Sequence, residues 1–377
     1  MAPADPPPRV PGQRPGGTGA PGLHARSAAA PDDPALLDLA ALEERARGLL
    51  PPAVVDYYAG GAEGEITLAE ATGAWRAWRL RPRVLRGGPP VQLSTRLLGS
   101  DVRTPIGIAP WAYQSLAHPD GERGSARGAA AVGALMTVST SASAALAEVA
   151  AAEPHAPKWF QLYRRHSPAY TDDLARRAGQ AGYRALVLTV DLPVLGLRLR
   201  DVANRMALPT GFPLGNAPPP GTPAAPTPEW TFDDISRFAG LSGLPVVVKG
   251  VLRGDDAARC VQAGAAAVWV STHGGRQADP VVSSAAALPE IADAVGDEVE
   301  VYADGGIRSG SDALTALALG ATAVFVARPV IWGLATGGAE GVADVLGGLS
   351  AQLAHTMALC GLSDVRSVPR DTVASAR

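Results

Sequence analysis

Four stretches of the sequence decide the fold: AVGALMTVS (131–139), QAGYRALVLTVD (180–191), QAGAAAVWVS (262–271) and ALGATAVFVA (318–327). In each one a helix-forming segment ends in glycine and an apolar run follows at once. Glycine suits the left-handed position that closes a helix. The runs are too continuously apolar for a sheet with one wet face, and are typical of buried parallel strands. The repeat therefore predicts successive helix–strand units.

Four further segments have the composition of buried strands: PIGIAP (105–110), PKWFQLY (157–163), LPVVVKG (244–250) and EVEVYADGG (298–306). Eight candidate strands thus lie within about 225 residues, and helical segments separate most of them. This number favours an α/β fold of the (β/α)8 TIM-barrel type over an open doubly wound sheet. No GxGxxG follows a strand, so the sequence gives no support to a dinucleotide-binding Rossmann site.

The regions outside the repeat predict the domain organisation. Residues 1–33 are rich in Pro, Gly, Ala and Arg, which predicts a disordered N-terminal extension. A helical segment begins near Pro34, so we expect the barrel domain to span residues 34–377, with a short helix before Gly60. The Pro-rich segment 209–230 predicts a long loop, and loops of this length often act as lids.

Composition indicates which classes of binding partner and which cellular compartment to expect. The net charge is −3, from 33 basic and 36 acidic residues, which gives no reason to expect nucleic-acid or membrane binding. Only two cysteines are present, Cys260 and Cys360, which suits a reducing cytoplasm. The sequence shows neither an apolar run of the ~20 residues that a spanning helix needs nor a signal peptide. We therefore expect a cytoplasmic protein.

Polar side chains gather where the predicted strands end, which is where barrels place active sites. The chain has 31 arginines and only two lysines, one of which is Lys249. A lysine kept in such a chain indicates a position that needs a compact point charge, which arginine cannot provide. The other polar strand ends are Ser139, Gln161, Tyr163, Thr189, Asp191, Ser271, Asp304 and Arg328. Each alone suits an ordinary polar strand end, but together they predict a site.

Two segments suggest an anion site. ADGGIRSGSD (303–312) places two glycines and Arg308 before a helix, whose first N–H groups bind anions. VFVARP then ends the last strand with Arg328, and barrel phosphate sites recur after strands seven and eight. The alternative is a tight turn with two surface arginines.

STHGGRQAD (271–279) places His273 at a strand end, three residues before Arg276. A lone histidine is more often structural. Here Asp191 ends another strand and can hold the imidazole, while Arg198 lies seven residues further on, although it could pair with Asp201 instead. Two arginines and a His–Asp pair suit a carboxylate substrate whose neighbouring C–OH loses a proton.

Taken in order, the motifs resemble the FMN-dependent 2-hydroxy-acid oxidising family, which includes glycolate oxidase, lactate oxidase and mandelate dehydrogenase. The resemblance runs from about Leu36 to Ser363 and rests on DYYAGGAEGEITLAEA (56–71), IAPWAYQSLAHPDGE (108–122), FQLY (160–163), LTVDLP (188–193), GLRLRD (196–201), VKGV (248–251), STHGGRQAD and DGGIRSGSD. It implies a barrel enzyme that binds FMN.

The resemblance also implies residue roles. His273 is the catalytic base, paired with Asp191; Arg276 and Arg198, helped by Tyr57, bind the substrate carboxylate. Tyr163 hydrogen-bonds substrate oxygens, Tyr113 lines the substrate pocket, and Lys249 stabilises the reduced flavin. The implied FMN-binding residues are Pro110, Trp111, Ala112, Ser139, Gln161, Thr189, Lys249, Ser271, Asp304, Gly305, Gly306, Arg308, Ala327 and Arg328.

Several positions depart from the family pattern, and Leu197 and Val194 also replace family arginines. Thr272 replaces an Asn, Ala327 a Gly, and Trp111 a smaller residue. Ser141 replaces a bulky aromatic residue and enlarges the pocket, which favours a bulky or aromatic substrate such as a mandelate. We expect oxidation of an L-2-hydroxy acid to the 2-keto acid, with O2 as acceptor and H2O2 as product, in a homo-oligomer that the resemblance makes a tetramer. The alternatives are a monooxygenase that decarboxylates its substrate and a flavoprotein repurposed in a biosynthetic pathway.

Overall fold

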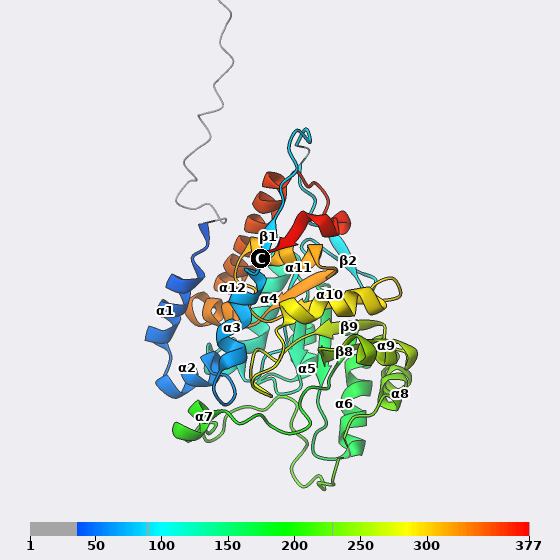
Figure 1. The fold of residues 1–377 in the computed structure, drawn as a ribbon. Coiled ribbons are helices and arrows are strands. Elements are labelled where there is room, and N and C mark those ends of the chain that lie inside the picture. The colour runs from blue at the N-terminus through cyan, green and yellow to red at the C-terminus, as the bar shows by residue number, and fades with distance from the viewer. Residues whose placement is uncertain (1–35, 89, 228, 377) are drawn as a thin grey trace, which may run out of the picture.

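The computed structural model describes residues 36–88, 90–227 and 229–376, and the predicted extension at 1–33 lies outside them. Eight parallel strands pair in chain order, and the last pairs with the first to close a barrel (Figure 1). The predicted (β/α)8 barrel is therefore confirmed. The strands are β4 (Ile106–Ile108), β5 (Met136–Ser139), β6 (Lys158–Leu162), β7 (Leu186–Thr189), β8 (Val246–Val251), β9 (Ala267–Val270), β10 (Glu300–Asp304) and β11 (Ala323–Val326).

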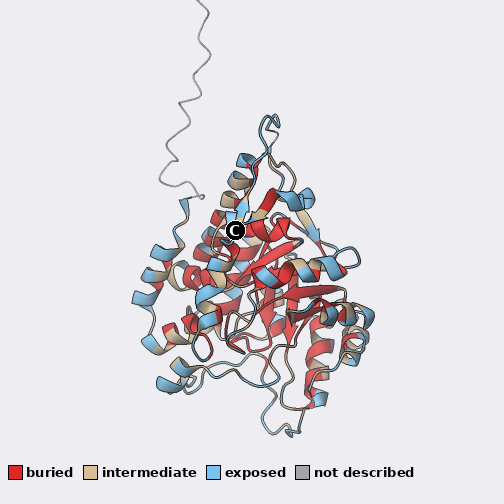
Figure 2. Cartoon of the chain, viewed as in Figure 1, coloured by how far each residue is buried: buried red, intermediate tan, exposed pale blue. Residues whose placement is uncertain are grey.

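Helices surround the barrel, and Figure 2 shows the buried strands at the centre with exposed residues on the outer helix faces. The helices that follow strands are α4 (Gly121–Val132), α5 (Leu146–Ala152), α6 (Pro168–Gln180), α7 (Leu199–Ala203), α8 (Asp233–Ser242), α9 (Gly254–Gln262), α10 (Ser284–Val295), α11 (Gly310–Ala318) and α12 (Arg328–Leu359). The last of these is kinked, since Gly337 and Gly338 have non-helical dihedral angles. Short 3-10 turns lie at Gln114–Leu116, Val365–Ser367 and Arg370–Thr372.

The N-terminal helices α1 (Leu39–Leu49), α2 (Pro52–Ala59) and α3 (Ile66–Trp75) precede the barrel, and α1 packs on α12. The two ends of the domain meet where β1 (Trp78–Leu80) pairs antiparallel with β12 (Val373–Ser375). A second small pair, β2 (Thr95–Leu97) with β3 (Ser100–Val102), joins the aromatic cluster inside the barrel through Leu97 and Val102. The chain before the first barrel strand thus packs both on the C-terminal part of the chain and on the cluster inside the barrel.

Glycines close the helices of the four repeats as predicted. Gly133, Gly182, Gly264 and Gly320 have φ angles of 67°, 83°, 97° and 108°. Side chains rarely adopt this conformation, so glycine is the residue that turns each helix into the next strand. Helix starts follow the same local logic: Ser167 caps α6 by accepting a hydrogen bond from the Tyr170 N–H at 3.2 Å, with Pro168 next in sequence.

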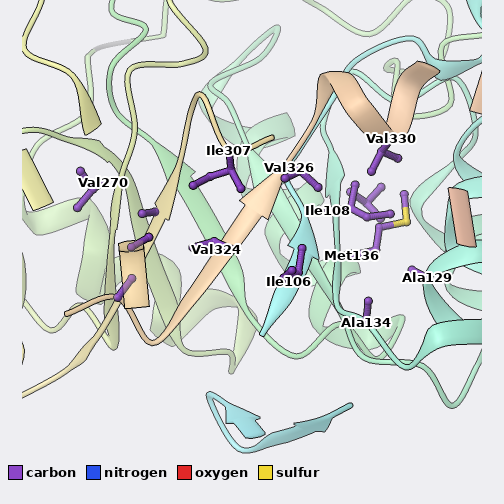
Figure 3. Packing of buried hydrophobic residues seen from close by; sticks show 14 of the residues in the cluster. Ile106, Ile108, Ala129, Ala134, Met136, Val270, Ile307, Val324, Val326 and Val330 are labelled. Carbon is purple, nitrogen blue, oxygen red and sulfur yellow. The ribbon is translucent and has the colours of Figure 1, made fainter. Parts of the chain in front are cut away.

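Aromatic rings fill the barrel interior. Trp269 and Phe325 lie 4.0 Å apart between ring centroids, and Trp159 lies 5.2 Å from Tyr302. Glycine at 107 leaves space for this cluster, because a Cβ there would come within 2.6 Å of the Phe325 ring. Outside the barrel, strand residues such as Ile108 and Val326 pack toward the helices with Val330 (Figure 3).

Strand periodicity shows where the polar strand ends lie relative to this aromatic cluster. Side chains two residues apart point to the same face of a strand. Two residues after Trp159, Trp269 and Tyr302 come Gln161, Ser271 and Asp304, which are also buried. The aromatic layer therefore forms a floor, and the polar strand ends stand on the interior directly above it.

Candidate active site

A cavity of about 600 Å³ opens above the aromatic floor. Most of the predicted site residues line it: Tyr57, Pro110, Trp111, Ala112, Tyr113, Ser139, Tyr163, Thr189, Arg198, Lys249, His273, Arg276, Asp304, Gly305, Gly306, Arg308, Ala327 and Arg328. Three predicted residues do not line it, and each instead contacts one that does: Asp191, Gln161 and Ser271. The structure thus brings together side chains from the ends of all eight barrel strands and from α2.

His273 has both ring nitrogens in contact with polar groups. Its Nδ1 lies 2.8 Å from Asp191 Oδ1, and its Nε2 lies 3.3 Å from the Tyr163 hydroxyl. Both partners of the His–Asp pair are largely buried, with 16% and 14% of their side-chain surfaces exposed. Burial opposes ionisation of Asp191, but His273, and less strongly Lys249, hold its pKa below the ordinary value. An ionised Asp191 keeps the proton on Nδ1, so Nε2 is the nitrogen able to accept another.

Backbone geometry sets this pair. His273, Gly274 and Gly275 all have positive φ, at 55°, 66° and 71°. Three left-handed residues in a row turn the chain sharply after β9, and glycine carries two of them at little steric cost. On the neighbouring strand β8, Gly250 has φ +103°, and a Cβ there would lie 2.5 Å from Asp191 Cγ. Glycine at 250 is therefore what leaves room for the carboxylate.

Two arginines come together beside the His–Asp pair. Arg276 is 6% exposed and donates from Nη1 to the carbonyl oxygens of Tyr57 at 2.6 Å and Gly60 at 2.9 Å. Arg198 Nε donates to the Arg276 carbonyl at 3.4 Å. Burial, with the nearby Arg198 charge, lowers the pKa of Arg276 to about 10. Burial also raises the pKa of the Tyr57 hydroxyl, so that side chain remains a neutral hydrogen-bonding group.

Lys249 belongs to a buried chain of polar groups at the ends of β8, β9 and β10. Its Nζ donates to Ser271 Oγ at 2.6 Å and lies 3.2 Å from Asp304 Oδ2. Ser271 Oγ in turn donates to Asp304 Oδ1 at 2.7 Å and accepts from the His273 N–H at 3.0 Å. Ser271 therefore ties the lysine, the aspartate and the histidine turn together, which explains its place behind the cavity wall.

The far side of the cavity is rich in positive charge. Arg328 is 8% exposed and donates only to carbonyl oxygens, those of Tyr58, Gly60 and Gly274, at 2.9–3.0 Å. Burial, with the charges of nearby arginines, lowers its pKa to about 9, and burial also lowers the pKa of Arg308. Since neither forms an ion pair with a carboxylate of the described residues, a bound anion would offset the cost of burying them.

Unpartnered polar atoms around the cavity allow a test of whether FMN fits. Gln161 Nε2, Thr189 Oγ1 and Trp111 Nε1 are buried and have no hydrogen-bond partner within the described part of the chain. Buried polar groups without partners are rare in folded proteins. A polar ring edge near Gln161 and Thr189, with a phosphate near Arg308 and Arg328, would satisfy both the orphan atoms and the uncompensated charge. The residues present therefore fit FMN.

A buried carboxylate organises the loop that carries Trp111, Ala112 and Tyr113. Glu122 is 0% exposed and accepts hydrogen bonds from the Gln114 N–H at 3.1 Å and the Ser143 N–H at 2.9 Å. The Tyr113 N–H donates to the Ser141 carbonyl at 3.0 Å. The loops after β4 and β5 are thereby joined, although sequence patterns indicated no role for Glu122.

Sequence patterns also missed several residues of the cavity wall. Arg164 and Arg165 follow β6, while Leu192, Leu195, Asp201, Met206 and Leu208 come from the segment after β7. The following Pro-rich segment is the predicted loop, since its described residues form neither helix nor strand. Asn216 anchors it: its Oδ1 accepts from the Leu146 N–H at 2.9 Å. Apart from Asp201, which lies in the five-residue helix α7, these wall residues lie in irregular segments, which have no periodicity to reveal which way they face.

The chain resembles known proteins over most of its length. The family model of the FMN-dependent dehydrogenases matches residues 46–375. An L-lactate oxidase of Nostoc sp. is 44% identical over 351 residues, covering 88% of this chain and 96% of the relative. The human 2-hydroxyacid oxidase 1 is 40% identical over 358 residues, which is 90% of this chain and 97% of the relative.

Solved structures agree with these relatives. A mandelate oxidase bound to (S)-2-phenylpropionate superposes with a TM-score of 0.83 at 41% identity, covering 88% of this chain and 96% of that one. A putative lactate oxidase of Pediococcus acidilactici gives a TM-score of 0.86 at 38% identity, covering 91% and 95%.

The fold and the fit to FMN define the class: the chain is an FMN-dependent oxidoreductase built on a (β/α)8 barrel. It belongs to the family of FMN-dependent dehydrogenases, with FMN as its cofactor. Among the described residues, no helix has the length and apolar character needed to cross a membrane.

Proposed function

We propose that the chain oxidises an L-2-hydroxy acid to the corresponding 2-keto acid, with O2 as the electron acceptor and hydrogen peroxide as the second product. The relatives named L-lactate oxidase and 2-hydroxyacid oxidase support this reaction. One observation carries the proposal: His273, held at 2.8 Å by Asp191 behind the wall, lines the same cavity as two arginines that form no ion pair with a described carboxylate. That combination suits an alcohol next to a carboxylate.

In the proposed reaction His273 Nε2 accepts the proton of the 2-hydroxyl group. Asp191 keeps the opposite nitrogen protonated and stabilises the imidazolium that forms. Arg276 and Arg198 bind the 2-carboxylate and so hold the hydroxyl near the imidazole. Tyr163, 3.3 Å from the same nitrogen, orients the substrate oxygens, and Tyr57 contributes its neutral hydroxyl.

FMN, when bound, supplies two-electron redox chemistry, which the side chains of the site do not provide. Ser139, Gln161 and Thr189 are the proposed partners of its ring edge, and Lys249 stabilises negative charge on the reduced ring. Arg308 and Arg328 are the proposed phosphate ligands. The remaining proposed contacts come from Pro110, Trp111, Ala112, Ser271, Asp304, Gly305, Gly306 and Ala327, of which only Ser271 stands behind the cavity wall.

The cavity wall favours a substrate larger than glycolate. Ser141 lines the cavity with a small side chain, so a bulkier residue at this position would take up cavity space, although the Arg165 guanidinium contacts the Ser141 hydroxyl. We infer from this that bulky 2-hydroxy acids, mandelates included, are accepted.

We also propose a homo-oligomer, a tetramer by the family resemblance, located in the cytoplasm. The exposed apolar residues Val194, Leu197, Leu199 and Val202, which do not line the cavity, support an interface, and the two buried free cysteines suit a reducing compartment. Light scattering after size-exclusion chromatography tests the assembly, and a monomer at micromolar concentration would contradict it.

Anaerobic reduction of the bound flavin tests the proposed reaction. The holoenzyme is mixed with glycolate, L-lactate, L-mandelate and longer L-2-hydroxy acids, and loss of the yellow absorbance is followed. At least one of these acids should bleach the flavin, and the enantiomer should not. His273→Ala should retain FMN and lose the bleaching, because the proton acceptor is gone. Bleaching at the wild-type rate in that variant would rule out His273 as the base.

A further inference from the structure

Two arginines that line the cavity, Arg164 and Arg165, belong to neither the 2-carboxylate clamp nor the proposed phosphate site. Arg165 follows β6 and lines the cavity. Its Nη2 donates to the buried Ser141 Oγ, and its guanidinium carbon lies 5.7 Å from the centroid of the Tyr163 ring. The Tyr163 hydroxyl contacts His273, so Tyr163 contacts both Arg165, through its ring, and the proposed base.

No carboxylate of the described residues forms an ion pair with Arg165. Its neighbour Arg164 differs, because it pairs with Asp234 at 2.8 Å and lies 4.1 Å from the centroid of the Trp230 ring. Of the described acidic residues, two line the cavity, Asp201 and Asp304.

Neither of those carboxylates pairs with Arg165. Asp304 pairs with Lys249 at 3.2 Å, and Asp201 forms no ion pair with any described cation. The charge of Arg165 is therefore free for a ligand.

Part of the wall of this cavity is apolar. Leu195, Met206 and Leu208 line the cavity from the segment after β7. Leu195 is 70% exposed, so covering it with a ligand would remove apolar surface from water. Methylene groups suit such a wall, and an anion suits the guanidinium, which binds carboxylates through paired hydrogen bonds.

We propose that Arg165 binds a second carboxylate at the distal end of the substrate, so that the preferred substrates are 2-hydroxy dicarboxylic acids. This inference rests on the proposed oxidation of a 2-hydroxy acid. The 2-carboxylate binds Arg276 and Arg198, the hydroxyl faces His273, and the methylene chain leads toward Arg165. Arg165 is a specificity residue and takes no part in the chemical step.

Matched substrates test this assignment. The holoenzyme is reduced anaerobically with L-2-hydroxyglutarate and with L-2-hydroxyglutaramate, which replaces the distal carboxylate by an uncharged amide of nearly the same shape. Arg165 is exposed, so its charge pair with a bound carboxylate predicts kcat/KM about threefold to tenfold higher for the dicarboxylate. The preference should shrink as salt concentration rises, since salt screens exposed charges.

Two variants test whether Arg165 causes the preference for the dicarboxylate. Arg165→Gln should lower kcat/KM for the dicarboxylate about threefold to tenfold, chiefly through KM, and leave the amide within about twofold of wild type. Its activity on the amide also shows that the variant is folded. The control is Arg164→Gln, which removes the adjacent but already paired charge. Whatever its overall activity, that control should keep the wild-type ratio between the two substrates.

Several results would overturn the inference. Equal use of the two substrates by the wild type, or an equal loss for both in Arg165→Gln, would show that Arg165 does not recognise a distal anion. A selective loss with mandelate would assign it to stacking on an aromatic ring instead. Bleaching by the amide without a dicarboxylate preference defeats this inference alone, whereas no bleaching by any 2-hydroxy acid defeats the proposed function and this inference with it.

Discussion

Replacing Asp191 by asparagine removes one charge from the site with little change in shape. The amide oxygen can still accept from His273 Nδ1, whose distance to the carboxylate is 2.8 Å in the wild type. The loss is electrostatic: when His273 takes a proton from substrate, no anion remains to stabilise the imidazolium. Because Asp191 stands behind the cavity wall, substrate and FMN contacts should be preserved.

The size of the effect follows from the geometry. With the two charges roughly 4 Å apart and an effective dielectric constant of about 20, their attraction is about 4 kcal/mol. At about 1.4 kcal/mol per factor of ten, this corresponds to a fall in the reduction rate of roughly 1,000-fold. The KM should change much less than kcat, since the 2-carboxylate still meets Arg276 and Arg198.

Anaerobic stopped-flow absorbance measures the reduction step directly, and the flavin spectrum before mixing reports how much FMN is bound. Asp255→Asn provides a control with the same chemical change on the surface, where Asp255 pairs with Arg253. We expect the control to reduce its flavin at the wild-type rate. A rate for Asp191→Asn within tenfold of wild type would refute the idea that the imidazole needs this carboxylate.

Three further predictions concern the cations and the buried glutamate. Arg276→Ala should raise KM at least tenfold and also lower kcat in steady-state assays; unchanged constants for every hydroxy acid would mean that the clamp is misassigned. Arg328→Gln should weaken FMN binding about tenfold to 100-fold in equilibrium dialysis, and wild-type retention would place the phosphate elsewhere. Burial raises the pKa of Glu122, so its protonated form stabilises the folded state at low pH, and this contribution is lost as pH rises through the folded value. Glu122→Gln should therefore unfold in urea with a flatter pH dependence above about pH 4.3, and parallel curves would contradict this.

Much of the barrel could be predicted from local patterns. The helices of the four repeats end at Gly133, Gly182, Gly264 and Gly320, where the backbone is left-handed. This is a local requirement that glycine meets best, so it can be recognised in the sequence. The buried strands are equally local, since a strand covered on both faces must be apolar along its whole length. Parallel strands then deliver their C-terminal residues to one rim, which is why strand order made Asp191 a possible partner of His273, the pairing that the family resemblance implied.

The sequence by itself thus determined the barrel, the rim on which the polar residues stand, and most of the residues that line the cavity. Only the tertiary structure decided how they meet: that Gly250 leaves space for Asp191, that Glu122 joins two loops, and that Arg165 has no carboxylate partner among the described residues while Arg164 has one. The physical reason is that these relations depend on which atoms of distant segments come within a few ångströms, and irregular loops have no period from which that could be inferred.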